Sequence, residues 1–384
     1  CRVPTKQTIH VGQSGISHGR HLPEIAMNKV IVNMLWLRPG QVGGSETYAI
    51  RLLKSLSETA ESPPIELVMT PAARRAHQFL ETSFAIAEQD PPLGRLGRIC
   101  RENYLFGRLE DHQLVHHLGG TIPKLPKAKK TVVTIYDVQY RNYPQYFSPV
   151  KRRYLDDAIQ RSLEQAEAVC TISQHCAESL EAHFGFPQEK CHIVPPAIDS
   201  PPFQEHQPSQ AKEFLLYPAV TWPHKSHQFL ITLLEQIPDL QLVLTGAEGS
   251  SHRKVMRAIR SSSAADRITH LGMVDTQRLN SLYQQALCTV FPSQYEGFGQ
   301  PVIEAMARGC PVISSQCGAL PETVGTGGVT LAMDIDQWVD AIQLIRQPHQ
   351  RQRWVELGFL RATHFSKKRT AETQITVYNE LLGR

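Results

Sequence analysis

The sequence predicts an α/β protein with two Rossmann-like domains, each a doubly wound parallel sheet, that face a cleft. First, the 384 residues exceed the length that one hydrophobic core usually serves, so we expect two domains. Second, short apolar runs alternate with amphipathic stretches, the pattern of a parallel sheet covered by helices on both faces. Third, a polar stretch with five prolines between residues 195 and 208 separates two such series, as an interdomain linker would. We therefore predict an N-terminal domain over 28–210, linker included, and a C-terminal domain over 211–365.

The first series begins with the apolar run 29–37, followed by the turn-forming letters RPGQVGG and an amphipathic stretch over 45–56. This order predicts a strand, a glycine loop and a helix. The same reasoning predicts further strands at 65–70, 131–135 and 168–172 and helices at 72–81 and 174–184. Residues 1–27 are polar and lack the apolar core of a signal peptide, so we expect a disordered extension that ends where a folded protein could begin, at Met27.

The second series follows the linker and has the same alternating pattern. It predicts strands at 214–219, 240–245, 268–271, 288–291 and 312–314 and helices at 228–235, 252–259, 276–285 and 301–308. Three further helices are predicted at 338–345, 350–365 and 366–382, and we expect the C-terminal segment 366–384 to pack back toward the first domain. Ligands of open α/β sheets bind outside the carboxyl ends of the strands, so the loops there are the place to look for chemistry.

Composition excludes several classes of function. The formal net charge of +4, from 40 basic and 36 acidic residues, is too small for nucleic-acid binding by bulk electrostatics. No apolar run approaches the ~20 residues that span a bilayer. The scattered cysteines form no CxxC pair, so we expect a cytoplasmic protein. Local basic residues are expected to be solvated, with contact to an anionic membrane as the alternative; they comprise Lys124, Lys127, Lys129, Lys130, Lys151, Arg152 and Arg153.

The segment 288–309, CTVFPSQYEGFGQPVIEAMARG, carries the clearest chemical signature. A strand ends at Phe291, a loop with two glycines follows, and Gln300 or Pro301 opens a helix that a later glycine closes. Such glycines allow backbone N–H groups to face a ligand, and a helix N-terminus favours an anion such as a diphosphate. Glu296 lies on the loop and Glu304 near the start of the helix, so one carboxylate can reach a sugar and the other a ribose.

In this setting the sequence resembles the retaining glycosyltransferases of family 4, whose mark is two glutamates separated by seven residues, as in EGFGQPVIE. With PVISSQCGALPETVG downstream and LGMVDTQRLNSLYQQA upstream, the resemblance covers nearly all of residues 212–384. The first half matches more weakly but in order, through VGGSETYAIRLL, HHLGGTIP, TVVTIYDVQYRNYPQYFSP and AVCTISQH. The resemblance implies the two-domain GT-B fold, with the acceptor bound mainly by the first domain and the nucleotide-sugar donor by the second.

The same resemblance assigns roles to the donor side. It implies that Glu296 lies near the donor sugar and the reacting centre, and that Glu304 contacts ribose hydroxyls. Lys225 is expected to neutralise the leaving diphosphate. Related enzymes often have an arginine six residues earlier, where this chain has Ala219, so His224 or Thr221 is expected to share the phosphate contacts. The other donor-binding residues that we predict are Gly43, Gly44, Met273, Val274, Gly297, Phe298 and Gly299.

Residues of the first domain are less specific. Tyr136 and Asp137 occupy the place of a His-Asp pair in related enzymes; the phenol can still bond a sugar hydroxyl, and the carboxylate either orients the acceptor or braces its loop. His116 and His117, before Leu118-Gly119-Gly120, resemble a cleft loop of the family, in which we expect neither histidine to touch substrate. Asp334-Ile335-Asp336 has the spacing of a DxD metal site, but we expect a solvated loop and no bound metal, and the chain has no HExxH, zinc-spaced or Walker A motif.

The resulting hypothesis is transfer of a hexose, with retention, from a nucleotide diphosphate sugar to a hydroxyl of a glycan or lipid-linked acceptor. The letters YPAVTWPHKSH resemble segments of mannosyltransferases that use GDP-mannose, and UDP-hexoses are the next candidates. A front-face route and a covalent intermediate on Glu296 both stay open, with the front-face route favoured by the resemblance. The alternatives to this activity are a nucleotide-sugar epimerase of the same architecture and a degenerate binding subunit.

Overall fold

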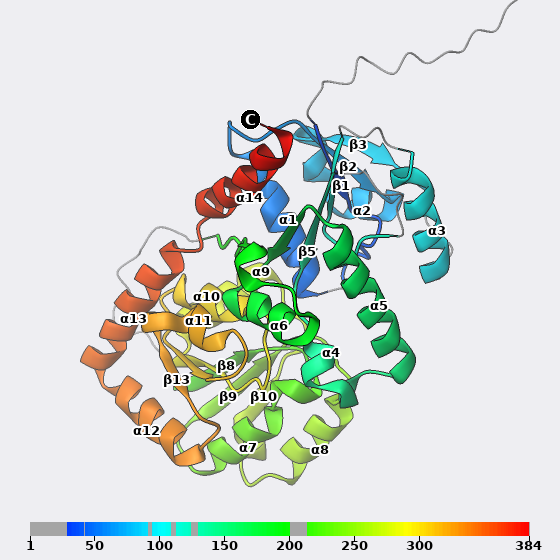
Figure 1. The fold of residues 1–384 in the computed structure, drawn as a ribbon. Coiled ribbons are helices and arrows are strands. Elements are labelled where there is room, and N and C mark those ends of the chain that lie inside the picture. Colours follow the sequence, from blue (N-terminus) through cyan, green and yellow to red (C-terminus); the bar gives the residue numbers. More distant parts are fainter. Residues whose placement is uncertain are drawn as a thin grey trace, which may run out of the picture.

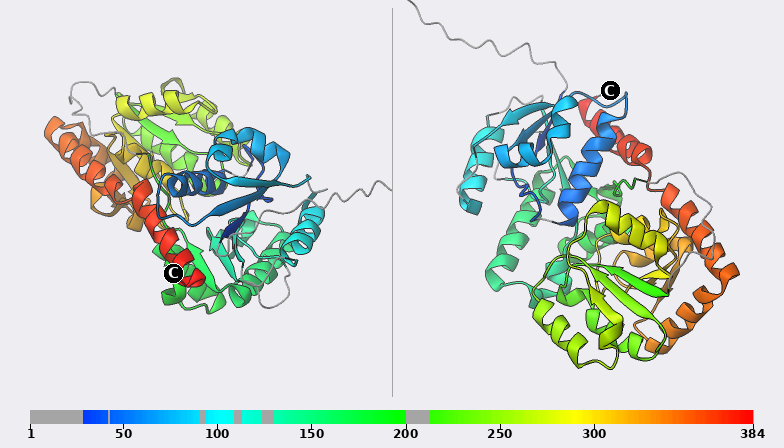
Figure 2. Two further views of the ribbon diagram at one scale, coloured as in Figure 1. Left: turned by 90° about the horizontal axis from the view of Figure 1, so that it is seen from above. Right: turned by 180° about the vertical axis from the view of Figure 1, so that it is seen from behind.

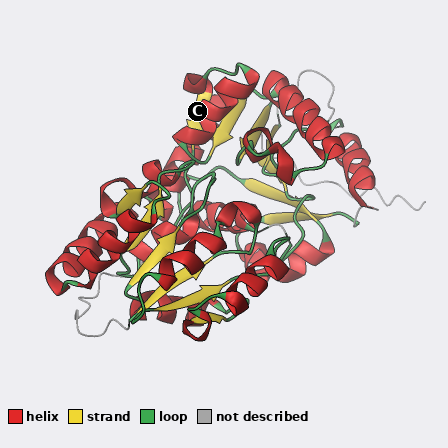
Figure 3. Cartoon of the chain, turned by 90° about the horizontal axis from the view of Figure 1, so that it is seen from below, coloured by secondary structure: helices red, strands yellow, loops and turns green. Residues whose placement is uncertain are grey.

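The computed structural model (Figure 1) describes residues 29–41, 43–90, 94–108, 113–123, 130–199 and 213–383. The predicted extension 1–27, most of the linker, and Lys124, Lys127 and Lys129 lie outside these described residues. The fold prediction is confirmed, because the chain forms two α/β units with parallel sheets. The first sheet has the strand order β3-β2-β1-β4-β5-β6-β7 and the second has the order β10-β9-β8-β11-β12-β13. Helices lie on both sides of the strands (Figure 3).

The first sheet is built from short strands, several of them buried along their whole length, as expected for a sheet covered on both faces. Its strands are β1 (Val30–Asn33), β2 (Ile65–Met69), β3 (Ala85–Glu88), β4 (Leu114–His117), β5 (Thr131–Ile135), β6 (Ala168–Thr171) and β7 (Cys191–Ile193). Its helices are α1 (Gly44–Ser57), α2 (Pro71–Ala76), α3 (Gly94–Phe106), α4 (Gln139–Asn142), α5 (Pro149–Gln165) and α6 (Gln174–Phe184).

The first strand is shorter than the apolar run 29–37 that predicts it. It ends at Asn33, because the Asn33 side chain accepts a bond from the N–H of Leu35 (3.1 Å) and its carbonyl accepts one from Trp36 Nε1 (3.1 Å). These local bonds turn the chain away from the sheet. No pattern in the sequence predicted β3, β4, β7, α3, α4 or α5. The strands β3 and β7 lie at the two edges of the sheet and are only partly buried, and α5 is strongly polar.

The second domain contains every element predicted for it, and it adds the helix α11 (Leu320–Val324) and the strand β13 (Val329–Leu331), which were not predicted. Its strands are β8 (Phe214–Pro218), β9 (Gln241–Thr245), β10 (Ile268–His270), β11 (Cys288–Phe291), β12 (Val312–Ser315) and β13 (Val329–Leu331). Its helices are α7 (His227–Glu235), α8 (His252–Ser261), α9 (Thr276–Gln285), α10 (Gln300–Met306), α11 (Leu320–Val324), α12 (Ile335–Arg346) and α13 (Pro348–Thr363). In this sheet β8 lies between β9 and β11, so the strand order reverses beside the loops that follow β8 and β11, where ligands of open sheets bind.

The final helix, α14 (Lys367–Leu382), lies beside α1 of the first domain in Figure 1 and in the right-hand view of Figure 2. Its Tyr378 hydroxyl bonds His116 Nδ1 (2.7 Å), and the carbonyl of Leu381 accepts a bond from Lys130 Nζ (2.9 Å). Just before α14 the chain crosses back from the second domain to the first. It passes beside the segment that leaves the first domain, and Ile198 N of that segment donates to Phe365 O (2.8 Å).

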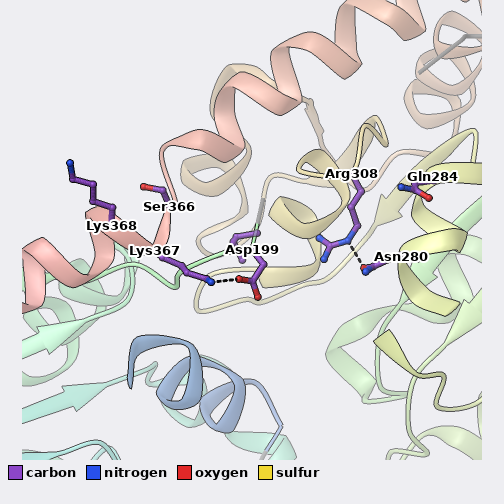
Figure 4. Close-up of a pocket in the computed structure, with 8 residues that line it drawn as sticks. Asp199, Asn280, Gln284, Arg308, Ser366, Lys367 and Lys368 are labelled. Atoms are coloured by element: carbon purple, nitrogen blue, oxygen red, sulfur yellow. Dashed lines mark hydrogen bonds and ion pairs between the residues drawn. The ribbon is translucent and has the colours of Figure 1, made fainter. Parts of the chain in front are cut away.

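A pocket of ≈ 570 Å³ lies beside these crossings (Figure 4). Lys367 and Asp199 pair across its wall at 2.9 Å, and Arg308 bonds Asn280 on the opposite side. None of the residues predicted to bind substrate lines this pocket.

Candidate active site

A cleft of ≈ 730 Å³ lies between the two domains and brings together most of the predicted site residues. Its walls come from the loops at the carboxyl ends of the strands, as the fold class predicts. From the first domain the lining includes Gly43, Gly44, Gly119, Gly120, Tyr136, Asp137 and Lys151, and from the second domain Ala219, His224, Lys225, Glu296, Gly297, Phe298, Gly299 and Glu304.

Lys225 and Glu296 form an ion pair in the second-domain wall, with side chains only 14% and 13% exposed. Lys225 ends a short 3₁₀ turn after β8, and its carbonyl accepts a bond from the Tyr217 hydroxyl (2.7 Å). The turn is also tied to the loop after β11, because Gln294 N donates to His224 O (2.7 Å). Two loops that are far apart in sequence thus hold a cation against a carboxylate at the cleft surface.

The loop that carries Glu296 is packed tightly from behind. Ala319 N donates to Glu296 O (2.9 Å), and Thr323 Oγ1 donates to Phe298 O (2.6 Å). A Cβ on Gly318, whose φ is +60°, would lie 2.6 Å from Glu296 O, so only glycine fits there. Gly299 then begins α10 with φ 92° and no side-chain cap on the helix. This packing fixes the backbone between the two glutamates.

Glu304 is paired with a residue that the sequence did not single out. Arg51, on α1 of the first domain, donates to the Glu304 carboxylate at 2.6 Å, and the side chains are 21% and 13% exposed. The two residues are 253 positions apart, so no local pattern links them. The available signal was that Arg51 follows Gly44 by two helical turns and therefore shares a face of α1 with the cleft glycines.

Asp137 both braces its loop and faces the cleft. Its Oδ1 accepts a bond from Gln139 N (2.9 Å), and the residue is among those that line the cavity. Desolvation between the cleft walls raises the pKa of this carboxyl, and the nearby Glu296 adds to the rise. Tyr136 also lines the cleft, but its hydroxyl already donates to Leu118 O (2.7 Å).

His116 and His117, which were not expected to touch substrate, are not among the cleft-lining residues. Both histidines lie in β4 and are fully buried. His116 bonds Tyr378 OH and Thr134 Oγ1 (2.8 Å), so it joins the sheet to α14. Burial lowers the pKa of each imidazole to about 3, which keeps both neutral. The glycines that follow them line the cleft instead.

Thr221 and His224, the two alternatives for the contacts of the arginine missing at position 219, lie in different surroundings. Thr221 is fully buried, and its hydroxyl accepts a bond from Gly249 N (2.8 Å), so it braces a loop and does not face the cleft. His224 lines the cleft, and burial, with a smaller effect of Lys225, lowers its pKa to about 4. A neutral His224 can exchange hydrogen bonds with a ligand but adds no charge.

Met273 and Val274 are not brought to the same cavity. They lie between β10 and α9, and Met273 is 74% exposed. Neither residue is among those that line the cleft.

Lys151, expected to be solvated, lines the cleft from α5. Its ammonium lies 4.8 Å from the centre of the Phe147 ring, and Leu155 and Ile159 continue the same helix face into the cavity. This spacing of four residues was present in the sequence, where a cation precedes two apolar residues on one face of a helix. The first-domain wall thus combines a cation, a carboxylate and apolar side chains.

Two negative findings apply to the described residues. Among them there is no group of three or more His, Cys, Asp or Glu side chains that could hold a metal ion. Asp334, from the DxD-like letters, is exposed and caps α12 by accepting a bond from Gln337 N (3.0 Å), whereas Ile335 and Asp336 begin that helix and do not lie in the expected loop. Within the same described residues, no helix has the length and apolar character needed to span a membrane.

Comparison with known proteins gives the class. A family model described as Glycosyltransferase Family 4 matches residues 42–200, and a model described as Glycosyl transferases group 1 matches residues 201–359. The two matches are adjacent and cover the two halves of the chain in order. The chain is therefore a glycosyltransferase with the GT-B fold, as the sequence predicts.

Its relatives include mannosyltransferases. The chain is 28% identical over 318 residues to the O-antigen chain mannosyltransferase B of Escherichia coli, and the aligned region covers 77% of this chain and 82% of the relative. It is 27% identical over 304 residues to the MMP alpha-(1->4)-mannosyltransferase of Mycolicibacterium hassiacum, with 73% of each chain covered.

Solved structures share the fold. The Alr3699/HepE protein of Anabaena, in complex with UDP and glucose, superposes with a TM-score of 0.70 at 16% identity, over 92% of this chain and 99% of that chain. Sucrose-phosphate synthase from Thermosynechococcus elongatus superposes with a TM-score of 0.74 at 19% identity, over 93% of this chain and 99% of that chain.

Proposed function

We propose that this glycosyltransferase moves a hexose, with mannose as the expected sugar, from a nucleotide diphosphate sugar to a hydroxyl of a glycan or lipid-linked acceptor, with retention at the anomeric carbon. The observation that carries the proposal is the convergence of Lys225, Glu296 and Glu304 on one cleft. The mannosyltransferase relatives favour GDP-mannose as donor, and the UDP complex of a protein with the same fold makes UDP-hexoses the second candidates.

In this proposal the second-domain wall binds the donor. The Lys225 ammonium stabilises the diphosphate as the bond between the anomeric carbon and the phosphate oxygen breaks and charge collects on that oxygen. Glu304 accepts bonds from the ribose hydroxyls, and Glu296 lies beside the sugar. Backbone N–H groups of Gly43 and Gly44 face the phosphates from across the cleft.

The proposed reaction follows a front-face route. The acceptor hydroxyl oxygen bonds to the anomeric carbon on the side that the diphosphate leaves, and the hydroxyl proton passes to the departing phosphate oxygen. The protein supplies position and charge, and its ion-paired Glu296 is not required to form a bond. Chemical trapping of a sugar on Glu296 would contradict this route and establish the covalent one.

In the proposal, the acceptor lies against the first-domain wall, near Asp137 and Lys151. The basic start of α5 also offers contact with an anionic membrane, since Val150, 82% exposed, stands beside Lys151 and Arg153. Flotation with vesicles containing anionic lipid tests this contact. We expect binding that is lost at high salt. Absence of flotation at low salt would remove the membrane from the proposal.

A thermal-shift screen against GDP-, UDP-, ADP- and dTDP-sugars tests the donor assignment, because a ligand that binds the native state raises the melting temperature. We expect the largest rise with GDP-mannose. Product analysis after incubation with the donor alone separates the activities, since a transferase yields slow hydrolysis and an epimerase yields an epimer. No shift with any sugar nucleotide would contradict the proposed function.

A further inference from the structure

We propose that Glu322, which lies outside the cleft, is a positioning residue that holds the first domain against the loop carrying Glu296. Its two carboxylate oxygens accept bonds from the backbone N–H groups of Gln174 (2.8 Å) and His175 (3.0 Å). Glu322 belongs to α11 of the second domain, whereas Gln174 and His175 open α6 of the first domain. The contact therefore crosses between the domains.

The N-terminus of α6 depends on this contact. The first N–H groups of a helix have no partner within the helix, and a carboxylate beside them is also favoured by the helix dipole. Ser173 caps the third of them, since its hydroxyl accepts a bond from Cys176 N (3.1 Å). The first two N–H groups are left to Glu322, so the start of α6 is completed by a side chain of the other domain.

The same end of α6 touches the loop that carries Glu296. The Ser173 hydroxyl donates to Gly297 O (2.7 Å), and the Cys176 thiol lies 3.3 Å from that carbonyl. A Cβ on Gly297 would lie 2.7 Å from the carbonyl oxygen of Tyr136, so the two domains meet backbone to backbone at this residue. A shift of α6 would therefore alter the surroundings of Glu296 directly.

Glu322 is itself held firmly within the second domain. Arg361 on α13 donates to the carbonyls of Glu322 (2.6 Å) and Thr323 (3.0 Å). Thr323 in turn donates to Phe298 O on the Glu296 loop. Because α11 is braced to the donor loop in this way, its carboxylate can transmit the position of that loop to α6.

Glu322 does not line the cleft, so its removal takes no side chain from the cleft lining. We expect such a variant to transfer sugar slowly and to lose less in nucleotide binding than in transfer. The reason is that the acceptor wall, with Asp137 and Lys151, belongs to the domain that is released. The predicted effect on transfer rests on the proposed function, whereas the effect on domain contact does not.

The test compares Glu322→Ala and Glu322→Gln with Asp334→Ala, a matched control that removes a carboxylate cap within the second domain alone. Hydrogen exchange at the amides of Gln174 and His175 should be about tenfold faster or more in Glu322→Ala. It should be raised less in Glu322→Gln, since an amide side chain has one accepting oxygen, and should be unchanged in the control. Small-angle scattering should give a larger radius of gyration for Glu322→Ala.

The functional readout is a split between turnover and binding. Transfer should fall about tenfold in Glu322→Ala, whereas the nucleotide affinity read from the thermal shift should fall about threefold at most. Unchanged amide exchange in both Glu322 variants would overturn the proposal, as would faster exchange with undiminished transfer or a parallel loss of nucleotide binding. If the wild type transferred no sugar at all, the proposed function would fail, and amide exchange and scattering would still decide whether Glu322 joins the domains.

Discussion

The two walls of the cleft are built in different ways. The second-domain wall is compact, with an ion pair between Lys225 and Glu296 and a glycine-containing loop braced from behind by α11. The first-domain wall is assembled from the ends of several strands and from α5, and its Lys151 stands exposed at the cleft. The donor side therefore depends on two loops of one domain, which follow β8 and β11, whereas the acceptor side depends on more elements scattered along the chain.

The largest expected effect comes from removing the Lys225 charge from the second-domain wall. Lys225→Ala should lower kcat/KM by about 100- to 1000-fold, the loss typical when one preorganised group that stabilises developing charge is removed. Initial rates with the preferred donor measure the effect. Lys254→Ala, on the exposed side of α8, is the matched control and should retain full activity. A Lys225→Ala enzyme within threefold of the wild type would remove the lysine from the mechanism.

A smaller effect is expected at the ion pair that joins the two walls, between Arg51 of the first domain and Glu304 of the second. Arg51→Ala should raise the donor KM about tenfold and leave kcat nearly unchanged, because Arg51 orients the Glu304 carboxylate. Glu304→Gln should have a similar effect, and the double variant should be no worse than the more affected single variant. Additive losses would show that Arg51 acts independently of Glu304.

Substitution of Lys151, in the first-domain wall, is expected to affect acceptor binding only. Lys151→Ala should raise the acceptor KM severalfold, whereas the thermal shift caused by the donor nucleotide should not change, since the charged donor residues Lys225, Glu296 and Glu304 lie on the opposite wall. Arg153→Ala, on the same helix but outside the cleft lining, serves as the control. A weakened donor shift in Lys151→Ala would contradict the division of labour between the walls.

The smallest expected effect concerns stability and is shared by both domains. Burial lowers the pKa of His116 and His117 to about 3 and that of His224 and His227 to about 4. Unfolded histidines have a pKa of about 6.5, so below that pH the unfolded chain binds protons that the folded protein does not. The melting temperature should therefore fall as the pH is lowered from 7.5 to 5. A constant melting temperature over this range would show that these imidazoles titrate in the folded protein.

The contrast between the walls also explains what the sequence could reveal. Glu296, Gly297 and Glu304 were predicted from a single stretch, because a strand, a glycine loop and a helix place them within a few residues of one another. The bounds of α9 and β11 were predicted to the residue, since their apolar periodicity is undisturbed. Local pattern was sufficient where the structure is itself local.

The remaining residues depend on contacts that no local pattern encodes. Arg51 acquires its partner only when the domains meet. Glu322 caps a helix whose first two residues lie 148 and 147 positions before it in the sequence. The histidines of β4 lie in a short strand, and of residues 116–120 only the two glycines line the cleft; the local sequence could not distinguish strand from loop at this point. Thr221 was one of two alternatives, with His224, for the contacts of the missing arginine, and it forms instead a bond to Gly249 that only the tertiary fold creates.

The most direct test of the central claim is a crystal structure of the protein with a non-hydrolysable sugar nucleotide. The account predicts the diphosphate within ion-pair distance of Lys225 Nζ, the ribose hydroxyls on the Glu304 carboxylate and the sugar beside Glu296. A nucleotide bound elsewhere, for example in the pocket between Asp199 and Arg308, with these three side chains untouched, would contradict it.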